Sequence, residues 1–144
     1  MILPDVNVLV YAFREDAPDH AAYHHWLQQL ISTDEPFAVS DHVLGGFLRV
    51  VTHPRVFRPP APIKLALAFA EAVRNRPTAV RIAPGERHWT TFRRLCRSAG
   101  VRGNLVPDAW LAALAIEHGC EFATTDRDFA RFSGLRWLHP LHPR

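Results

Sequence analysis

The chain has 144 residues, 48% of them hydrophobic, and a net charge of +3. This length fits one domain, residues 1–144, with a core large enough to need no disulfide or structural metal. The composition excludes a membrane protein, since no run reaches about 18 apolar residues, and the acidic N-terminus and two unpaired cysteines predict a cytoplasmic protein rather than a secreted one.

Several elements are expected in the first half of the chain. An apolar, β-branched stretch predicts a buried strand over residues 1–6. A helix from Asp19 to Leu30 follows Pro18, and a short strand covers Phe37 to Val39. Ser40 is an N-cap for a helix that runs to about Val51. A proline-rich connector then precedes the second half.

The second half continues the alternation of helices and strands. The expected helices are 63–75, 87–98 and 108–118, with a helical turn at 129–132, and the expected strands are 79–83, 121–124 and 135–138. Strands that alternate with helices form right-handed crossovers. The sequence therefore predicts an α/β fold, a three-layer α/β/α sandwich with a central, mainly parallel sheet.

Three aspartates lie at the ends of predicted elements. Asp5 ends the first strand, Asp126 follows the strand that ends at Thr124, and Asp108 begins the helix before that strand. Ligands of open parallel sheets bind beyond the carboxyl ends of the strands. We therefore expect the three carboxylates to meet at one rim, although the position of Asp108 depends on the tertiary fold.

Each aspartate also has a simpler interpretation. Asp108 could complement a helix N-terminus, and Asp126 could be a turn residue. Asp5 is different, because a carboxylate that ends a buried strand needs a partner or a metal. Ligands that are all oxygen favour Mg²⁺, with Mn²⁺ as a substitute, over Zn²⁺. Asn7 and Thr124 or Thr125 could orient a ligand or water, or could cap the loops.

Basic residues concentrate in the middle of the chain. Residues 36–107 carry twelve Arg or Lys against three acids, whereas residues 1–35 carry one against six. This distribution suits a phosphate-rich partner, and an Arg-rich solvated surface is the alternative. Arg55, Arg93 and Arg97 are the candidates for contact with RNA phosphates.

Four stretches, in family order and spanning nearly the whole chain, resemble the PIN-domain ribonucleases, and most closely the VapC-type toxins of type II toxin–antitoxin modules. They are Asp5–Ala12, Gly46–Phe57, Gly103–Asp108 with Leu111–Ala115, and Thr124–Phe129. The resemblance implies a PIN-like fold and endonucleolytic cleavage of RNA by metal-activated water. It also implies a VapB-type antitoxin as partner and a homodimer.

By the same resemblance, Asp5 and Asp108 are the principal Mg²⁺ ligands, Asp126 is the third acid and Asp128 a weaker auxiliary. One position departs from the family. Many relatives carry a Glu six residues after the Ser that opens the second helix, and here that position is Gly46. The missing carboxylate predicts one well-held Mg²⁺ rather than two. Adjacent glycines would cost a helix about 2 kcal/mol, so we also expect a close backbone approach there.

Two rival functions follow from the same residues. A phosphatase with an aspartyl nucleophile at Asp5 would need a second Asp where Asn7 stands, and a catalytic Lys where the chain offers Lys64 alone. A catalytically degenerate PIN-like domain that binds RNA or a partner without cutting is the main alternative, because Gly46 replaces the expected acid.

Overall fold

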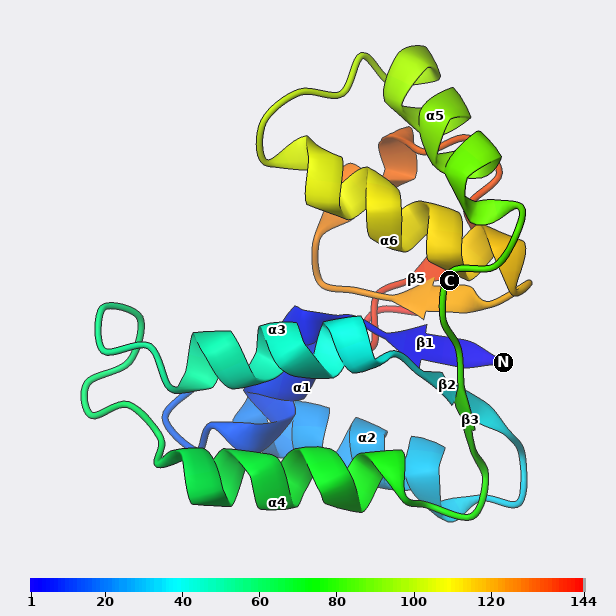
Figure 1. Ribbon diagram of the computed structural model, residues 1–144. Coiled ribbons are helices and arrows are strands. Elements are labelled where there is room, and N and C mark those ends of the chain that lie inside the picture. Colours follow the sequence, from blue (N-terminus) through cyan, green and yellow to red (C-terminus); the bar gives the residue numbers. More distant parts are fainter. Residues whose placement is uncertain (144) are drawn as a thin grey trace.

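Short parallel strands form the centre of the protein. The computed structural model describes residues 1–143, and its strands are β1 (Ile2–Pro4), β2 (Phe37–Val39), β3 (Ala79–Arg81), β4 (Glu121–Ala123) and β5 (Trp137–Leu138). Parallel pairs join β1 to β4, β4 to β5, and β2 to β3. Because β2 lies beside β1, the strands follow one another in the order β3-β2-β1-β4-β5 (Figure 1).

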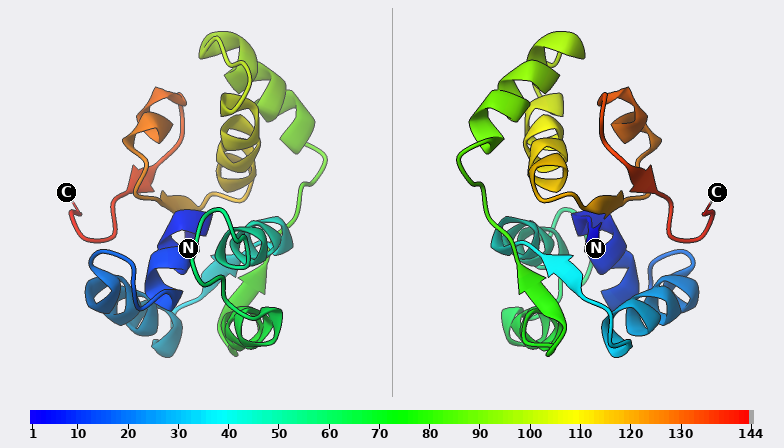
Figure 2. Two further views of the ribbon diagram at one scale, coloured as in Figure 1. Left: turned by 90° about the vertical axis from the view of Figure 1, so that its left-hand side faces the viewer. Right: turned by 90° about the vertical axis from the view of Figure 1, so that its right-hand side faces the viewer.

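Helices pack on both faces of these strands. They are α1 (Val6–Phe13), α2 (His20–Ser32), α3 (Asp41–Val51), α4 (Ile63–Arg74), α5 (His88–Ser98) and α6 (Leu105–Glu117), and a 3-10 helix, η1, covers Arg127–Arg131. Figure 2 shows α1 and α2 on one side of the β1-β4-β5 strands and α5 and α6 on the other. The predicted α/β/α sandwich with a mainly parallel sheet is thereby confirmed.

The strand order creates a switch point between β1 and β4. From β1 the chain moves outward to β2 and β3, and it then returns across β1 to β4. The carboxyl ends of strands at such a point are the usual location of a ligand site in an open α/β sheet. Asp5 directly follows β1 and Thr124 directly follows β4, so the topology alone places both at this point.

The predicted strand over residues 1–6 is wrong after Pro4, and sequence analysis missed α1 altogether. Asp5 has extended backbone and acts as the N-cap, since its carboxylate accepts a hydrogen bond from the backbone N–H of Val6 at 2.7 Å. A helix packed on several sides lacks a polar face, so its sequence looks like that of a buried strand. The residues of α1 that are buried are Val8, Leu9, Val10 and Ala12.

The other predicted elements appear with small shifts at their ends. Ser40 caps α3 as expected, because its hydroxyl accepts a hydrogen bond from the N–H of Val43. Helix α6 begins at Leu105, three residues before the predicted start at Asp108, and holds Pro107 in its first turn. A proline is tolerated there since the first N–H groups of a helix have no intrahelical acceptor. No helix in residues 1–143 is long and apolar enough to cross a membrane.

Candidate active site

A cleft of about 750 Å³ opens at the carboxyl ends of β1 and β4. Asp5 and Asn7 reach it from the junction of β1 and α1, Asp108 from the first turn of α6, and Asp126 from the segment after β4. The structure therefore brings the three predicted aspartates to one cavity, although they are separated by up to 121 positions in the sequence.

Asp5 is held rigidly at the base of this cleft. Only 6% of the surface of Asp5 is exposed. One carboxylate oxygen accepts the N–H of Val6, and the other accepts the hydroxyl of Thr124 at 2.8 Å and the side-chain amide of Asn7 at 3.3 Å. The Thr124 bond links the end of β1 to the end of β4, so the sheet itself fixes the orientation of the carboxylate.

Asn7 and Thr124 join the loops around the acids into one network. The Thr124 hydroxyl, fully buried, accepts the backbone N–H of Asp126 at 3.1 Å and the amide of Asn7 at 3.3 Å. The Asn7 carbonyl oxygen accepts the N–H of Thr125 at 3.3 Å. Asn7 and Thr124 thus orient Asp5 and also hold the loop after β4, whereas the predicted role of orienting a ligand or water stays a prediction.

The three acids repel one another, and within the described residues no ion pair offsets their charge. The pKa of Asp5 is raised to about 6, chiefly by burial and with smaller contributions from the charges of Asp108 and Asp126, against the lowering effect of the hydrogen bonds from Thr124 and Val6. Burial, followed by the charge of Asp126, also raises the pKa of Asp108, and the charge of Arg131 opposes this rise. Within the described residues, none of the three forms an ion pair.

The donor set fits a hard divalent cation whose coordination is completed by water and phosphate. In the part of the chain that the structure describes, no group of three or more His, Cys, Asp or Glu forms a preassembled metal centre. Mg²⁺ needs no such cage, because one or two carboxylates with waters and substrate oxygens suffice. Asp5 and Asp108 could supply those carboxylates, with Asp126 beside them.

Asp126 has a second structural role outside the cleft, and Asp128 does not line the cleft. Asp126 caps η1, since its carboxylate accepts the N–H of Asp128 at 2.9 Å, which is the turn role also considered from sequence. Asp128 is exposed, lies 3.8 Å from the guanidinium of Arg131 and does not line the cleft. Asp128 therefore lies outside the cleft lining, although its charge, after burial and the charge of Asp126, also raises the pKa of Asp108.

Arg49 is a cationic cleft residue that the sequence analysis did not single out. It is exposed in the last turn of α3 and lines the cavity, as do His42, Gly45 and Gly46 from the same helix. Their i, i+3 and i, i+4 spacing puts them on one helix face, a signal that was present in the sequence. The other arginine candidates lie outside the cleft lining, Arg55 just after α3 and Arg93 and Arg97 on α5.

Gly46 marks the close helix approach expected from the glycine pair. A Cβ added there would lie 3.0 Å from Cγ2 of Val6, whereas one added to Gly45 would meet nothing within 4 Å. Helix α3 therefore packs against the start of α1 at Gly46. A glutamate at that position would have to displace Val6, the residue next to Asp5.

Comparisons with known proteins show the family of the chain. Residues 2–135 match the PIN domain family. The chain is 48% identical to the ribonuclease VapC43 of Mycobacterium tuberculosis, covering 98% of this chain and 96% of that protein, and 44% identical to VapC25 of the same organism, covering 97% and 99%. The structure of VapBC-1 from nontypeable Haemophilus influenzae superposes with a TM-score of 0.70 at 14% identity, covering 99% of this chain and all of that one.

The fold and the acidic cleft define a PIN-domain protein. Within this family, the chain is 44–48% identical to VapC ribonucleases over nearly its whole length. The chain belongs to the VapC ribonucleases of the PIN-domain family.

Proposed function

We propose that this protein is the toxin of a type II toxin–antitoxin module and cleaves RNA endonucleolytically with Mg²⁺. One observation carries the proposal: Asp5, buried and bonded to Thr124, shares a cleft with Asp108 and Asp126, and within the described residues none of the three is in an ion pair. A buried carboxylate beside two like charges is stabilised by a bound cation. The ribonuclease relatives support RNA as the substrate.

Each residue of the cleft would have a distinct role in phosphodiester hydrolysis. A divalent cation bound by Asp5 and Asp108 would lower the pKa of a coordinated water and offset charge on the phosphate. Thr124 and Asn7 fix the carboxylate of Asp5 through the hydrogen bonds described above. Arg49, exposed on the cleft wall, would hold a phosphate oxygen with its planar guanidinium.

The protein partners are part of the same proposal. We expect a VapB-type antitoxin as partner, because VapBC-1 of Haemophilus influenzae has the same fold. We also expect the protein to form a homodimer. The cleft has an apolar wall on which an antitoxin segment could pack, including Val56, which is 55% exposed, and Phe57. An occupant there would lie beside the acids and block access of RNA to them.

Cleavage of labelled structured RNAs tests the activity. The purified protein should cut in Mg²⁺, stop in EDTA and recover with Mn²⁺. Asp5→Ala should lose at least about 100-fold in rate, in line with the effect of removing a metal-site group. Asp34→Ala is the matched control, since Asp34 is exposed between α2 and β2.

Two results would reject the mechanism: cutting that persists in EDTA, or cutting that survives Asp5→Ala. RNA binding without any cutting in Mg²⁺ or Mn²⁺ would instead favour the degenerate binding domain. The metal count is tested separately by calorimetry with Mn²⁺. We expect one tight site, because Gly46 supplies no carboxylate and packs on Val6, and two tight sites would contradict that.

A further inference from the structure

A second cavity adjoins the acidic cleft at the carboxyl ends of β2 and β3. This flanking pocket has a volume of about 390 Å³, within the range of small-ligand sites. Its walls include His42, Arg74, Arg81, Ile82, Pro84 and Trp110. His42 lines the flanking pocket and the acidic cleft alike, so the two cavities share one wall.

An aromatic pair stands at the boundary between the two cavities. The ring of His42 stacks on the indole of Trp110 with centroids 4.3 Å apart and planes inclined by 30°. His42 is exposed, and Trp110 follows the proposed metal ligand Asp108 by two positions on α6. The exposed ring of His42 lines the same cleft as Asp108, and an aromatic surface there is suited to stacking a nucleobase.

The charge of the flanking pocket favours a phosphate group. Arg74 is occupied by Asp41, through two hydrogen bonds of 2.7 and 3.1 Å, so the two charges cancel. Arg81 ends β3, is exposed, and has no ion pair or side-chain hydrogen bond within the described residues. The Arg81 charge also lowers the pKa of Asp41, which lines the same pocket, after the larger effect of Arg74. Two guanidinium groups therefore share one carboxylate, which leaves a net positive charge for an incoming anion.

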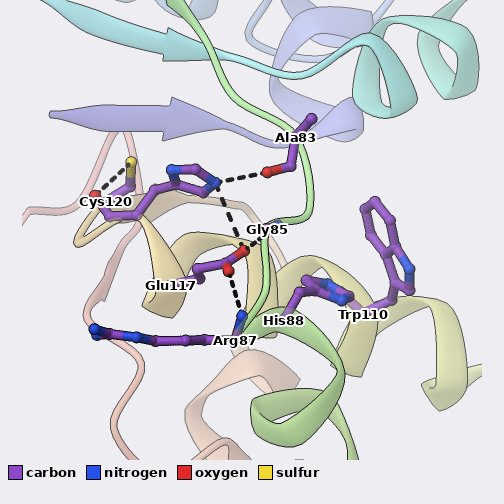
Figure 3. Close-up of polar contacts among 8 residues, drawn as sticks. Ala83, Gly85, Arg87, His88, Trp110, Glu117 and Cys120 are labelled. Atoms are coloured by element: carbon purple, nitrogen blue, oxygen red, sulfur yellow. Dashed lines mark hydrogen bonds and ion pairs between the residues drawn. The ribbon is translucent and has the colours of Figure 1, made fainter.

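The wall of the flanking pocket is fixed to the helix that carries Asp108. In the segment that leads from β3 to α5, the N–H groups of Gly85 and Arg87 donate to Glu117 of α6 at 2.8 and 3.0 Å (Figure 3). The buried ring of His88 lies with Nε2 3.0 Å from the carbonyl oxygen of Trp110. These contacts attach the segment after Pro84, which lines the pocket, to the helix that also carries Asp108.

We propose that the flanking pocket is a subsite for the nucleotide next to the scissile phosphate, with its base on the His42–Trp110 pair and its phosphate at Arg81. The proposal rests on the function proposed above. It predicts that the RNA strand follows the carboxyl edge of the sheet, from β1 and β4 toward β2 and β3. Specificity for the adjacent base would then be decided by the shape of this pocket rather than by the metal site.

Binding of fluorescein-labelled single-stranded RNA of about 12 nucleotides, a length that a single-strand site can hold, tests the base contact. Losing one aromatic stacking partner should weaken binding about fivefold or more for His42→Ala. His42→Phe should restore binding to within about twofold, since it keeps the stacking surface. His25→Ala, which removes an exposed histidine of α2, is the control.

The phosphate contact is tested by the salt dependence of the same binding. Arg81→Ala should flatten the slope of log affinity against log salt by about 0.7, the value for one phosphate of a single strand. Arg87→Ala is the matched control, because Arg87 is exposed and Figure 3 shows its side chain pointing away from Trp110. Both variants alter exposed side chains, and their thermal unfolding should match that of the unaltered protein.

Two further readouts separate this subsite from the proposed activity. Photocross-linking with RNA that contains 4-thiouridine should label the segment around His42 or Trp110. In cleavage assays His42→Ala should raise KM and leave kcat nearly unchanged. If His42→Ala and Arg81→Ala bind like their controls while the protein still cuts RNA, the subsite is wrong and the ribonuclease proposal stands. If nothing is cut but the binding differences appear, only the activity fails.

Discussion

Replacing Asp5 by Asn should make the protein more stable at neutral pH in the absence of metal. The native fold raises the pKa of Asp5 from 3.8 to about 6, chiefly by burial, and at 1.36 kcal/mol per pKa unit this corresponds to about 3 kcal/mol. Asn removes that cost but loses the bond from the Asn7 amide, because both groups are then donors. The expected net gain at pH 7.5 is therefore about 2 kcal/mol.

The sign of the pH dependence follows from the same shift. Between pH 3.8 and about 6 the folded protein binds the Asp5 proton more tightly than the unfolded chain, so its stability falls as the pH rises through this window. Below it the carboxyl is neutral in both states, and the advantage of Asp5→Asn should vanish. Urea unfolding at pH 3 and pH 7.5, with Asp34→Asn as an exposed control, measures the difference.

Divalent metal should reverse the comparison, because Mn²⁺ binds the native carboxylate and stabilises only the protein that retains Asp5. The reasoning is refuted if Asp5→Asn is equally stable relative to the parent at both pH values, or less stable at pH 7.5 without metal. In either case burial would not be the main influence on this carboxylate.

Three other predictions follow from the cleft. In Mg²⁺, RNA cleavage should fall as the pH is lowered through about 6, because a protonated Asp5 is a poor metal ligand; a rate that is flat from pH 5 to 8 would contradict this. Thr124→Val should destabilise the protein by about 1–3 kcal/mol, since it leaves buried polar groups unpaired, and urea unfolding would show it. Gly45→Ala should stabilise α3 by about 1 kcal/mol. Gly46→Ala should not give this stabilisation, because its Cβ would lie 3.0 Å from Cγ2 of Val6, and it should give it in a protein that already carries Val6→Ala.

Local patterns in the sequence were enough for most elements. Helical spacing, Ser40 and the prolines predicted α2 to α5 within a few residues, because caps, breakers and amphipathic faces act within one or two helical turns. Helix α1 was missed since Val6 to Val10 is apolar throughout and is buried by packing from other parts of the chain. The one local signal for it is an N-cap at Asp5, and the sequence analysis interprets that residue as the end of a strand instead.

The sequence alone also singled out Asp5, Asp108 and Asp126 as candidates and predicted that they meet, but the contacts that bring them to one cleft depend on the tertiary fold. Asp5 and Thr124 are joined by strand pairing between β1 and β4, and Asp108 reaches the cleft through the placement of α6. The exclusion of Asp128, the inclusion of Arg49 and the pocket beside His42 were likewise decided by packing. Spacing along the chain constrains neighbours within a few residues, whereas contacts between segments a hundred residues apart depend on the strand order and on which helix faces become buried.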